Sequence, residues 1–465
     1  MANRTLLVTG LTGLIGRRAA VPLLKAGYRL RGLSRDPLKA AEALPLPIEW
    51  FSQHDLSHAL RGVEGVVHLA GEPVAGKRWN AKRKAAIRAS RVEGTQALVA
   101  AIAAMKKPPK VFVSASAVGI YGDAGEARRS DARAVPGHAP AAGGNAFLRE
   151  VCEAWERSWS EGLPKRTRGV GLRIGMVLAQ EGGALAELLP LFKLGVGGPL
   201  AGGQPWTPWI HVDDVVGLIL HALQDPRARG VLNAVGPESV RNVHFTRVLG
   251  ALLRRPAFAP VPTPALRLLY GEMADIVLAS QKATPTKALK LGYRFKHATL
   301  ESALAEELVF DGHTGVNVLD SYQWIPQPLG KVWPFFSDAK NLETLTPDFL
   351  RFKVLSAETR NTHTGSLLDY RLSLHGLPVR WRTLILAWQP EGKTPYFVDL
   401  QLGGPYGLWH HTHRFEALRG GTLMRDTVRY KLPLGWFSQP AEPWVRRDVA
   451  GIFQFRVSAI KRLFD

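Results

Sequence analysis

Apolar residues in the first part of the chain form short runs that are separated by polar or glycine-rich turns. The run Leu6–Val8 predicts a strand, and the segment Leu14–Ala26 predicts a helix that ends at Gly27. Further strands are predicted at Tyr28–Leu33 and from Val66 onward. Strands that alternate with helices are typical of a parallel sheet covered by helices.

The last third of the chain has a different pattern, in which strands predominate. A strand begins at Leu319, and two short helical stretches follow at 332–338 and from Asn341. The β-type segments after them, separated by turns, are 352–355, 366–374, 379–388, 397–402, 409–416 and 422–432. The chain closes with a predicted helix over 442–464, in which apolar residues recur at helical spacing.

The turn after the first strand reads TGLTGLIG and has the glycine spacing of a dinucleotide-binding turn. Gly10 permits the tight turn, Gly13 lets a pyrophosphate approach the backbone, and Gly16 lets the helix pack closely on the strand. The amides at the helix N-terminus then face the phosphates. A plain turn before a packed helix has the same glycines, but the flanking strand and helix favour a cofactor site. The candidate cofactor-binding residues here are Gly10, Thr12, Gly13, Leu14, Ile15 and Gly16.

Ser34 and Arg35, at the end of the second strand, favour NADP over NAD. An NAD site needs an acid near this point for the ribose 2′-hydroxyl, whereas an NADP site needs a base and a hydroxyl for the 2′-phosphate. Asp36 follows the base and precedes a proline, so we expect it to turn outward. Arg17 is a second candidate phosphate partner. The alternative is that both arginines are solvated surface residues.

Two further segments fit the same crevice. Asp55 and Leu56 follow a short strand, and Asp55 is expected near an adenine amino group. The strand from Val66 runs into a turn of small residues, where the backbone passes close to the cofactor. The candidate residues of that turn are Leu69, Ala70 and Gly71.

These motifs stand in a fixed order along the chain: TGLTGLIG, SR, DL, HLAGEP, SASAVGIYG and WIHVDD. The ordered set resembles an extended short-chain dehydrogenase/reductase of the atypical, epimerase-like branch (NAD-dependent epimerase/dehydratase-like). Residues 242–300 are similar to the C-terminal cap of that branch. The resemblance implies an α/β Rossmann fold, a doubly wound parallel sheet with a small cap. It also implies that Glu72 and Arg78 reach the cofactor.

The catalytic residues of that family are only partly present. Its members use a serine beside the fifth strand and a Tyr-x-x-x-Lys helix, whose lysine lowers the pKa of the tyrosine that exchanges a proton. Ser116 matches the serine, but no tyrosine occurs between Tyr121 and Tyr270. Ser116 and Tyr121 are the candidate catalytic residues, although Tyr121 in its strand-end turn has packing as an alternative role.

Cys152 and His211 are weaker substitutes for the missing acid/base pair. A cysteine on an amphipathic helix is more often a small buried residue than a nucleophile. His211 lies at a strand-to-helix junction, where we expect Asp213 and Asp214 to cap the helix 215–223.

The order of elements in the last third resembles the helix-grip arrangement of the SRPBCC (START-like, polyketide-cyclase-like) superfamily, over residues 318–465. The segments that carry this resemblance are NLETLTP, LHGLPVRWRT, FVDLQLGGPYGLWHHTHRF and GTLMRDTVRYKLP. It implies an α+β domain in which a curved sheet wraps the long helix and leaves an apolar cavity for a small-molecule ligand.

Three histidines in HHTH suggest a metal site in this second domain. Strand periodicity puts His411 and His413 on one face and His410 on the other, so only two can share an ion. Zinc needs three or four ligands, and we therefore assign no metal. We expect a polar lining of the cavity mouth instead. The expected ion-pair partners are Arg414, Asp426 and Arg429.

Composition narrows the class of protein. One cysteine excludes an internal disulfide and fits a reducing compartment. The first strand begins too early for a leader, and no apolar run approaches a membrane span, so a cytoplasmic location is expected. Of the net charge of +21, residues 1–300 hold +19, from 41 basic and 22 acidic residues. The densest basic cluster is Lys77, Arg78, Lys82, Arg83, Lys84, Arg88 and Arg91.

This charge favours anionic ligands. Nucleic acid is not expected as a partner, because Trp79 is the only aromatic residue within the cluster and no nucleic-acid motif accompanies it.

The sequence thus predicts a first domain over 1–305, a linker over 306–317 and a second domain over 318–465. The expected function is that of an NADP(H)-dependent oxidoreductase or epimerase acting on an organic substrate, fused to a domain that binds an apolar ligand. The alternative is a noncatalytic, NADPH-dependent binding or regulatory protein, which the missing Tyr-x-x-x-Lys pair favours.

Overall fold

The computed structural model describes residues 4–75, 78–132, 143–356 and 362–464. The chain forms two compact units. The N-terminal unit consists of residues 1–43 and 48–308, and the C-terminal unit consists of residues 44–47 and 309–465.

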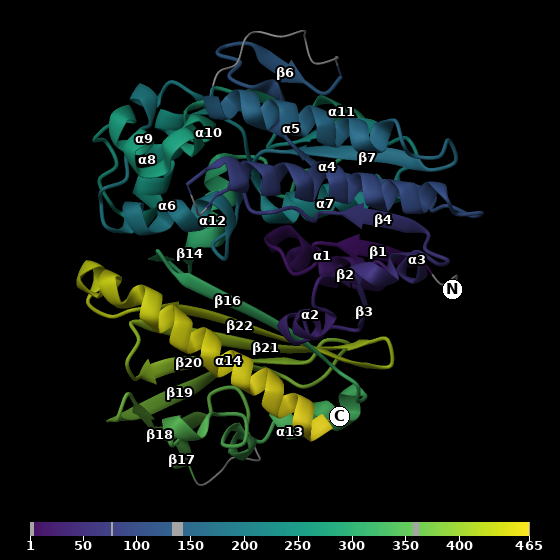
Figure 1. Cartoon of the computed structure of the whole chain (residues 1–465). Coiled ribbons are helices and arrows are strands. Elements are labelled where there is room, and N and C mark those ends of the chain that lie inside the picture. The colour runs from purple at the N-terminus through teal and green to yellow at the C-terminus, as the bar shows by residue number, and fades with distance from the viewer. Residues whose placement is uncertain (1–3, 76–77, 133–142, 357–361, 465) are drawn as a thin grey trace. The chain divides into compact units, whose positions relative to one another are not determined.

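A seven-stranded parallel sheet forms the centre of the N-terminal unit (Figure 1). Its strands, in spatial order, are β11 (Gly230–Ala234), β7 (Arg168–Ile174), β5 (Val111–Ala117), β4 (Gly65–His68), β1 (Thr5–Thr9), β2 (Arg29–Ser34) and β3 (Ile48–Ser52). The direction of winding reverses between β1 and β4. In open sheets of this type, ligands bind in the crevice at the carboxyl ends of the two strands that flank the reversal. The sheet confirms the predicted Rossmann arrangement.

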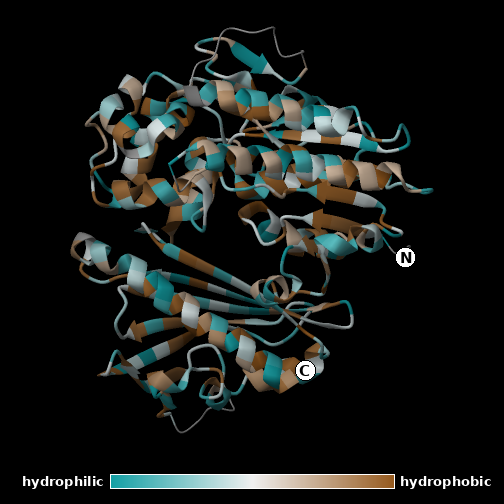
Figure 2. Cartoon of the chain, in the orientation of Figure 1, coloured by the Kyte–Doolittle hydropathy of each residue, from teal (hydrophilic) through white to brown (hydrophobic). Residues whose placement is uncertain are grey.

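Two pairs of helices pack along the sheet, α1 with α7 and α4 with α5. The helices that follow or flank the strands of this sheet are α1 (Leu14–Lys25), α2 (Pro37–Ala43), α3 (Leu56–Ala59), α4 (Ala81–Ala103), α5 (Gly143–Ser160) and α7 (Val212–Gln224). Leu7 and Phe112 of the sheet are fully buried in one core with Val99 of α4 and Trp159 of α5. Figure 2 shows the strands at the centre of this sheet as hydrophobic runs, as expected for strands that are buried on both faces.

The remaining part of the N-terminal unit consists of shorter elements. Its second core brings together α6, α8 and α12, with Leu189, Phe245 and Leu304 among the buried residues. The elements are β6 (Arg128–Ser130), β8 (Met176–Leu178), α6 (Gly183–Lys193), β9 (Trp206–Thr207), β10 (Trp209–His211), β12 (Val240–Arg241), α8 (Asn242–Leu253), α9 (Thr263–Tyr270), α10 (Ala274–Leu278), β13 (Lys282–Thr284), α11 (Thr286–Lys290) and α12 (Leu300–Leu308).

A seven-stranded antiparallel sheet forms the C-terminal unit. Its strands, in spatial order, are β16 (Asn317–Ile325), β22 (Gly421–Lys431), β21 (Leu408–Leu418), β20 (Tyr396–Gly403), β19 (Leu377–Gln389), β18 (Leu367–Leu374) and β17 (Lys353–Val354). A separate small hairpin, β14 (Val309–Phe310) with β15 (His313–Thr314), precedes it, and α13 (Leu329–Phe336) follows β16.

The long helix α14 (Glu442–Phe464) packs on this sheet (Figure 1). Its residues Val449 and Phe453 are buried against Val428, and Ile460 is buried in a core with Phe415. The predicted strands and the closing helix of this region are therefore present, with small shifts in their bounds.

The backbone N–H of Trp324 on β16 donates to the carbonyl of Pro45 (2.8 Å), within the C-terminal unit. The segment 44–47 thus contacts the edge strand of a sheet whose strands all lie beyond residue 316. No helix in the described ranges combines the length and the apolar content needed to cross a membrane.

Candidate functional site

The glycine-rich turn lies at the carboxyl end of β1 and is tightly packed against β4. Gly10 has a φ of +75°, and a Cβ atom there would lie 2.7 Å from the carbonyl carbon of Leu69. A Cβ atom on Gly16 would lie 2.2 Å from the carbonyl oxygen of Gly10. Glycine is required at both positions, because the opposing atoms are backbone and cannot move aside as a side chain can.

No side chain caps the start of α1, and the N–H of Gly13 donates to the carbonyl of Gly10 (3.0 Å). The N-cap of α1 is Gly13, which has no side chain to cap the helix, and the first turn holds no acidic residue. Thr12 and Gly13 are exposed. Arg17 donates through Nε to the carbonyl of Thr12 (2.8 Å), so its guanidinium lies against the turn. The amides and the positive end of the helix dipole favour an anion here.

A buried histidine fixes the turn after β4. The imidazole of His68 lies between the hydroxyls of Thr9 (2.7 Å) and Thr95 (3.0 Å), and burial lowers the pKa of His68 to about 4. The Thr9 hydroxyl in turn accepts the N–H of Ala70 (3.2 Å). The neutral imidazole therefore helps to hold the Leu69–Ala70 backbone beside Gly10. Sequence analysis had assigned no role to His68, although it lies within HLAGEP.

Glu72 is held by α4. Its carboxylate pairs with Arg83, its N–H donates to Ser90 (3.0 Å), and its carbonyl accepts from Arg91 (3.0 Å). Arg78 is exposed, whereas Lys77 of the predicted basic cluster lies outside the described residues. Part of that cluster is thus neutralised locally and does not form a free basic surface.

The residues predicted to bind the adenosine end are arranged at the ends of β2 and β3. Arg35 is exposed. The hydroxyl of Ser34 bonds to the backbone of Asp36, and the carboxylate of Asp36 accepts the N–H of Lys39 (3.1 Å), which caps α2. The carboxylate of Asp36 is therefore engaged by the first turn of its own helix. Asp55 accepts from Ser52 (2.6 Å) and is exposed.

Ser116 and Tyr121 belong to one buried polar network. The Ser116 hydroxyl donates to Glu156 (2.7 Å), and Arg173 forms a two-point ion pair with the same carboxylate (2.8 and 2.7 Å). The Tyr121 hydroxyl accepts from Arg173 (3.0 Å) and donates to Asn233 (2.8 Å). The network brings both predicted catalytic residues together. Sequence analysis missed Glu156 and Arg173, because α5 and β7 supply them from distant parts of the chain.

Burial and ion pairing set the protonation of this network at rest. Burial raises the pKa of Tyr121 in spite of the adjacent Arg173, so its phenol stays protonated. Burial alone would lower the pKa of Arg173, but Glu156 outweighs it and the pKa is raised. Burial also raises the pKa of Cys152 to about 12, and its thiol packs in a hydrophobic cluster with Val118. The prediction that Cys152 is a small buried residue is confirmed.

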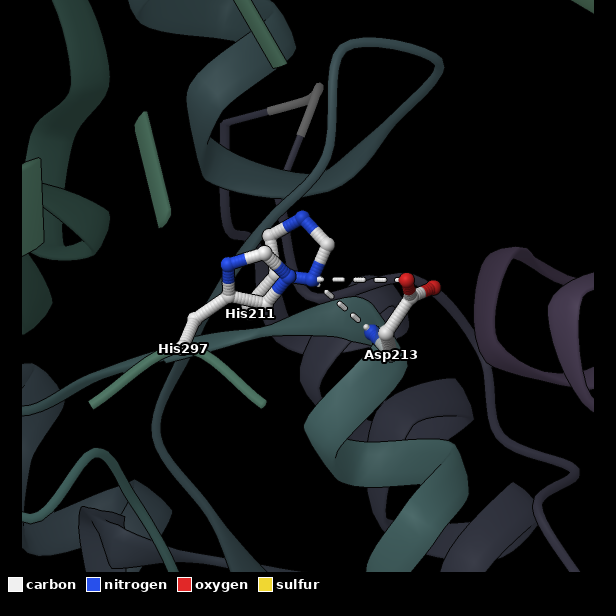
Figure 3. A group of neighbouring side chains, drawn as sticks. All are labelled: His211, Asp213 and His297. Atoms are coloured by element: carbon white, nitrogen blue, oxygen red, sulfur yellow. Dashed lines mark hydrogen bonds and ion pairs between the residues drawn. The ribbon is translucent and has the colours of Figure 1, made fainter. Parts of the chain in front are cut away.

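His211 is fully buried, and both of its ring nitrogens are used within the N-terminal unit. Figure 3 shows His211 beside His297 and Asp213. Its Nδ1 accepts the N–H of Asp213 (3.2 Å), and its Nε2 lies 3.0 Å from Glu307. The prediction that the two aspartates cap α7 is wrong, because His211 itself is the N-cap. Asp214 instead accepts the N–H groups of Lys296 (2.7 Å) and His297 (3.0 Å).

A cavity of about 180 Å³ lies within the C-terminal unit. Most of its lining is apolar or aromatic, including Phe336, Leu368, Trp381, Trp388 and Phe453. Asp399, His411, His413 and Arg456 supply a polar group on its wall. His411 and His413 therefore line the cavity, but they are buried within it and not placed at its mouth as expected.

The partners of these histidines differ in part from those predicted. Asp426 faces both His411 (3.1 Å) and His413 (2.9 Å). The guanidinium groups of Arg414 and Arg429 lie over the rings of Tyr396 and Phe310 instead. These two arginines miss the cluster because, like His410, they project from positions of β21 and β22 that alternate with those of His411, His413 and Asp426.

Burial alone would raise the pKa of Asp426, but Arg456 and His413 outweigh it and hold this pKa well below the usual range. His411 and His413 likewise outweigh the burial of Asp399, whose pKa is also lowered. Both carboxylates, Asp399 in the cavity wall and Asp426 behind the histidines, are therefore charged.

Comparisons with known proteins concern the N-terminal two thirds of the chain. The family model described as NAD dependent epimerase/dehydratase family matches residues 6–235, and a domain of unknown function, DUF1731, matches residues 261–307. The Arabidopsis thaliana protein named "Epimerase family protein SDR39U1 homolog, chloroplastic" is 39% identical, over 65% of this chain and 86% of the relative. Epimerase family protein SDR39U1 of Bos taurus is 37% identical, over 64% of this chain and 98% of the relative.

A crystal structure of human epimerase family protein SDR39U1 with NADPH is similar to this chain, with a TM-score of 0.58 and 33% identity. The match covers 65% of this chain and 98% of the human one. The strand order, the glycine turn and these relatives agree. The chain therefore belongs to the NAD dependent epimerase/dehydratase family, among the epimerase family proteins of the SDR39U1 type.

Proposed function

We propose that the N-terminal unit binds NADP(H) and uses it to reduce or epimerise a small organic substrate. The observation that carries this proposal is the glycine turn, in which Gly10 and Gly16 bring the start of α1 against the Leu69–Ala70 backbone. The first turn of α1 holds no carboxylate that would repel a phosphate. The NADPH in the human relative's structure supports the same assignment.

The chain's own residues fit the parts of such a cofactor. The amides of Thr12 and of Leu14 to Gly16 would hold the pyrophosphate beside Gly13, whose own N–H donates to Gly10 (3.0 Å). Ser34 with Arg35 would bind the 2′-phosphate. Asp55 and Leu56 would contact the adenine. The small-residue turn at 69–71 would let the cofactor pass close to the backbone. Glu72 and Arg78 are weaker candidates for contacts with the cofactor. The carboxylate of Glu72 is already paired with Arg83.

The bound cofactor would supply the hydride, and the buried network would handle the proton. Ser116 would donate a hydrogen bond to a substrate oxygen after exchanging its present bond to Glu156. Tyr121, which burial keeps protonated, would donate rather than accept a proton. Arg173 would hold both side chains through Glu156 and the phenol oxygen.

A noncatalytic, NADPH-dependent binding protein is the second candidate function. One observation favours it: the hydroxyls of Ser116 and Tyr121 are both engaged by protein partners. No lysine follows on α5 to lower the pKa of a tyrosine, since the helix reads FLREVCEAWE over 147–156.

For the C-terminal unit we propose an SRPBCC-like helix-grip domain over 318–465 that binds an apolar small molecule. The antiparallel sheet, the long helix α14 and the aromatic lining of the cavity support this proposal. The corresponding division assigns 1–305 to the epimerase-like domain, with its cap at 242–300, and 306–317 to the linker.

Calorimetric titration of the full chain with NADPH and NADH tests the cofactor assignment. Arg35→Ala should weaken NADPH binding about 10- to 100-fold and leave NADH unchanged, since a charge-assisted bond to the 2′-phosphate is lost. The matched control is Arg29→Ala, an exposed arginine at the opposite end of β2. Equal affinities for both cofactors in the native chain would refute the assignment.

Single-turnover oxidation of NADPH separates the two candidate functions. Screened or copurified ligands should oxidise the cofactor in the native chain, and Ser116→Ala should slow this about 10²-fold without changing NADPH affinity. If every ligand leaves NADPH unoxidised while ligand binding tightens in its presence, the noncatalytic function is the correct one.

A further inference from the structure

Four acidic and imidazole side chains meet on three neighbouring strands of the C-terminal sheet. Asp399 on β20 is directly opposite His411 on β21, and His413 on β21 is directly opposite Asp426 on β22. His411 and His413 are two residues apart and therefore point to the same face of the sheet. The three strands run side by side in Figure 1.

Three of these side chains offer ligand atoms toward one point. His413 Nε2 lies 2.9 Å from Asp399 Oδ2, and His411 Nδ1 lies 3.5 Å from the same oxygen. The centres of the two imidazole rings lie 3.7 Å apart, and the ring planes are tilted by 38°. Ligand atoms of all three residues lie within 4.8 Å of one another. Two imidazole nitrogens and one carboxylate oxygen are the donor set of many divalent transition-metal sites.

The fourth side chain lies behind the histidines. Asp426 Oδ1 is 3.1 Å from His411 Nε2 and 2.9 Å from His413 Nδ1, the nitrogens that do not face Asp399. Metal-binding histidines commonly donate their outer N–H to a carboxylate in this way, which fixes the tautomer. Asp426 does not line the main cavity, whereas the other three residues do.

Hydrogen-bond counting shows two arrangements of this cluster, and one of them leaves room for a cation between the three donors. A neutral imidazole carries one N–H. If both histidines donate to Asp426, their other nitrogens present lone pairs to the Asp399 carboxylate, which is repulsive. The competing arrangement uses Arg456, whose Nη2 lies 3.3 Å from His413 Nδ1, as the donor to that nitrogen. In that arrangement His413 Nε2 donates to Asp399 (2.9 Å), and a bound cation would replace this hydrogen bond.

We propose that Asp399, His411 and His413 bind one divalent transition-metal cation in the wall of the cavity, with Asp426 positioning both histidines. The remaining coordination positions face the apolar cavity, which is the arrangement of sites that keep an exchangeable ligand. This proposal is independent of the NADP(H) assignment.

The second group with suitable atoms in the described ranges, His211, Asp213 and His297, is a weaker candidate. The ring nitrogens of His211 are already bonded to the Asp213 amide and paired with Glu307, and Lys296 pairs with Asp213 (2.7 Å).

Metal titration of the full chain tests the proposal. Protein stripped with a chelator is titrated with Zn²⁺ alone by calorimetry and with Co²⁺ alone by visible absorption. The native chain should bind one ion per chain. His411→Gln, His413→Gln and Asp399→Asn should each abolish stoichiometric binding, and Asp426→Asn should weaken it about 10- to 100-fold.

His410→Gln is the matched control, because its ring lies against Phe310 outside the cluster. This variant should bind the ion as the native chain does. Near-ultraviolet circular dichroism establishes whether each variant is folded. If a variant is unfolded, the Co²⁺ absorption spectrum of the native chain still reports whether nitrogen atoms bind the ion. Native protein that binds neither ion would overturn the proposal. So would binding that survives His411→Gln, or that is lost in His297→Gln.

Discussion

Replacing Gly16 by alanine tests whether the glycine turn positions α1. The added Cβ atom would lie 2.2 Å from the Gly10 carbonyl oxygen and 2.6 Å from the Cα atom of Leu11. Ordinary contacts need about 3.5 Å, so α1 must move by roughly 1 Å at its start. Both opposing atoms are backbone, and no rotamer change can relieve the overlap.

The magnitude follows from this displacement. Overpacking of a buried site costs about 1–3 kcal/mol, and the unyielding backbone places Gly16→Ala at the upper end. The gain in helix propensity offsets at most about 1 kcal/mol. We therefore expect the free energy of unfolding of the N-terminal unit to fall by about 2 kcal/mol. NADPH affinity should fall as well, because the amides at the start of α1 move with the helix.

Gly94→Ala provides a control of opposite sign. Gly94 lies in the middle of α4, is exposed, and has no atom within 4 Å of an added Cβ. Alanine there should raise the free energy of unfolding by about 0.5–1 kcal/mol. Urea denaturation followed by circular dichroism, with NADPH calorimetry, measures both variants. Equal stability and NADPH affinity in Gly16→Ala and the native chain would refute the packing argument.

Three other predictions concern buried groups and the division of the chain. Glu156→Gln should lower the free energy of unfolding by about 3–5 kcal/mol in urea denaturation, because Arg173 is left buried without its counter-ion; a change below about 1 kcal/mol would contradict this. The pKa of His68 is about 4 in the folded chain against 6.5 unfolded, so the unfolded state binds the proton first and stability is lost as the pH falls from 6.5 to 4. Between pH 6.5 and 4, the free energy of unfolding of the native chain should fall by about 3 kcal/mol more than that of His68→Asn. Parallel pH profiles of the two proteins would refute this prediction. Cleavage at Gly312 should leave two fragments that are both folded by circular dichroism. The C-terminal fragment should be less stable than the same unit in the intact chain by about 0.5–1.5 kcal/mol, because Trp324 loses its hydrogen bond to the carbonyl of Pro45. An unfolded C-terminal fragment would contradict this division.

Local patterns predicted the elements well where one segment decides its own structure. The buried residues Leu6–Val8 of β1 read as an apolar run, and the apolar spacing of 442–464 gives α14 with the same bounds. Strand periodicity also placed His410 on the opposite face of the sheet from His411 and His413. These features depend only on residues that are neighbours in sequence, which is why pattern alone finds them.

The chemistry of the sites depends on contacts that no local pattern contains. Asp399 supplies the third donor beside His411 only because β20 and β21 pair in one register, so the histidines alone predicted no metal. Glu156 reaches Ser116 across 40 positions of the sequence. The cap of α7 was misassigned because an aspartate is the usual N-cap, whereas here Asp214 is taken up by the backbone of a later segment.

The bond between Pro45 and Trp324 has a consequence for the order of events during synthesis of the chain. Pro45 leaves the ribosome early, and Trp324 follows roughly 280 residues later, after about 15–55 s at 5–20 residues per second. Throughout that interval the segment 44–47 lacks the rest of the compact unit to which it belongs. A chaperone that protects nascent chains would therefore have an exposed segment to recognise near the start of this protein, long before its last strand is made.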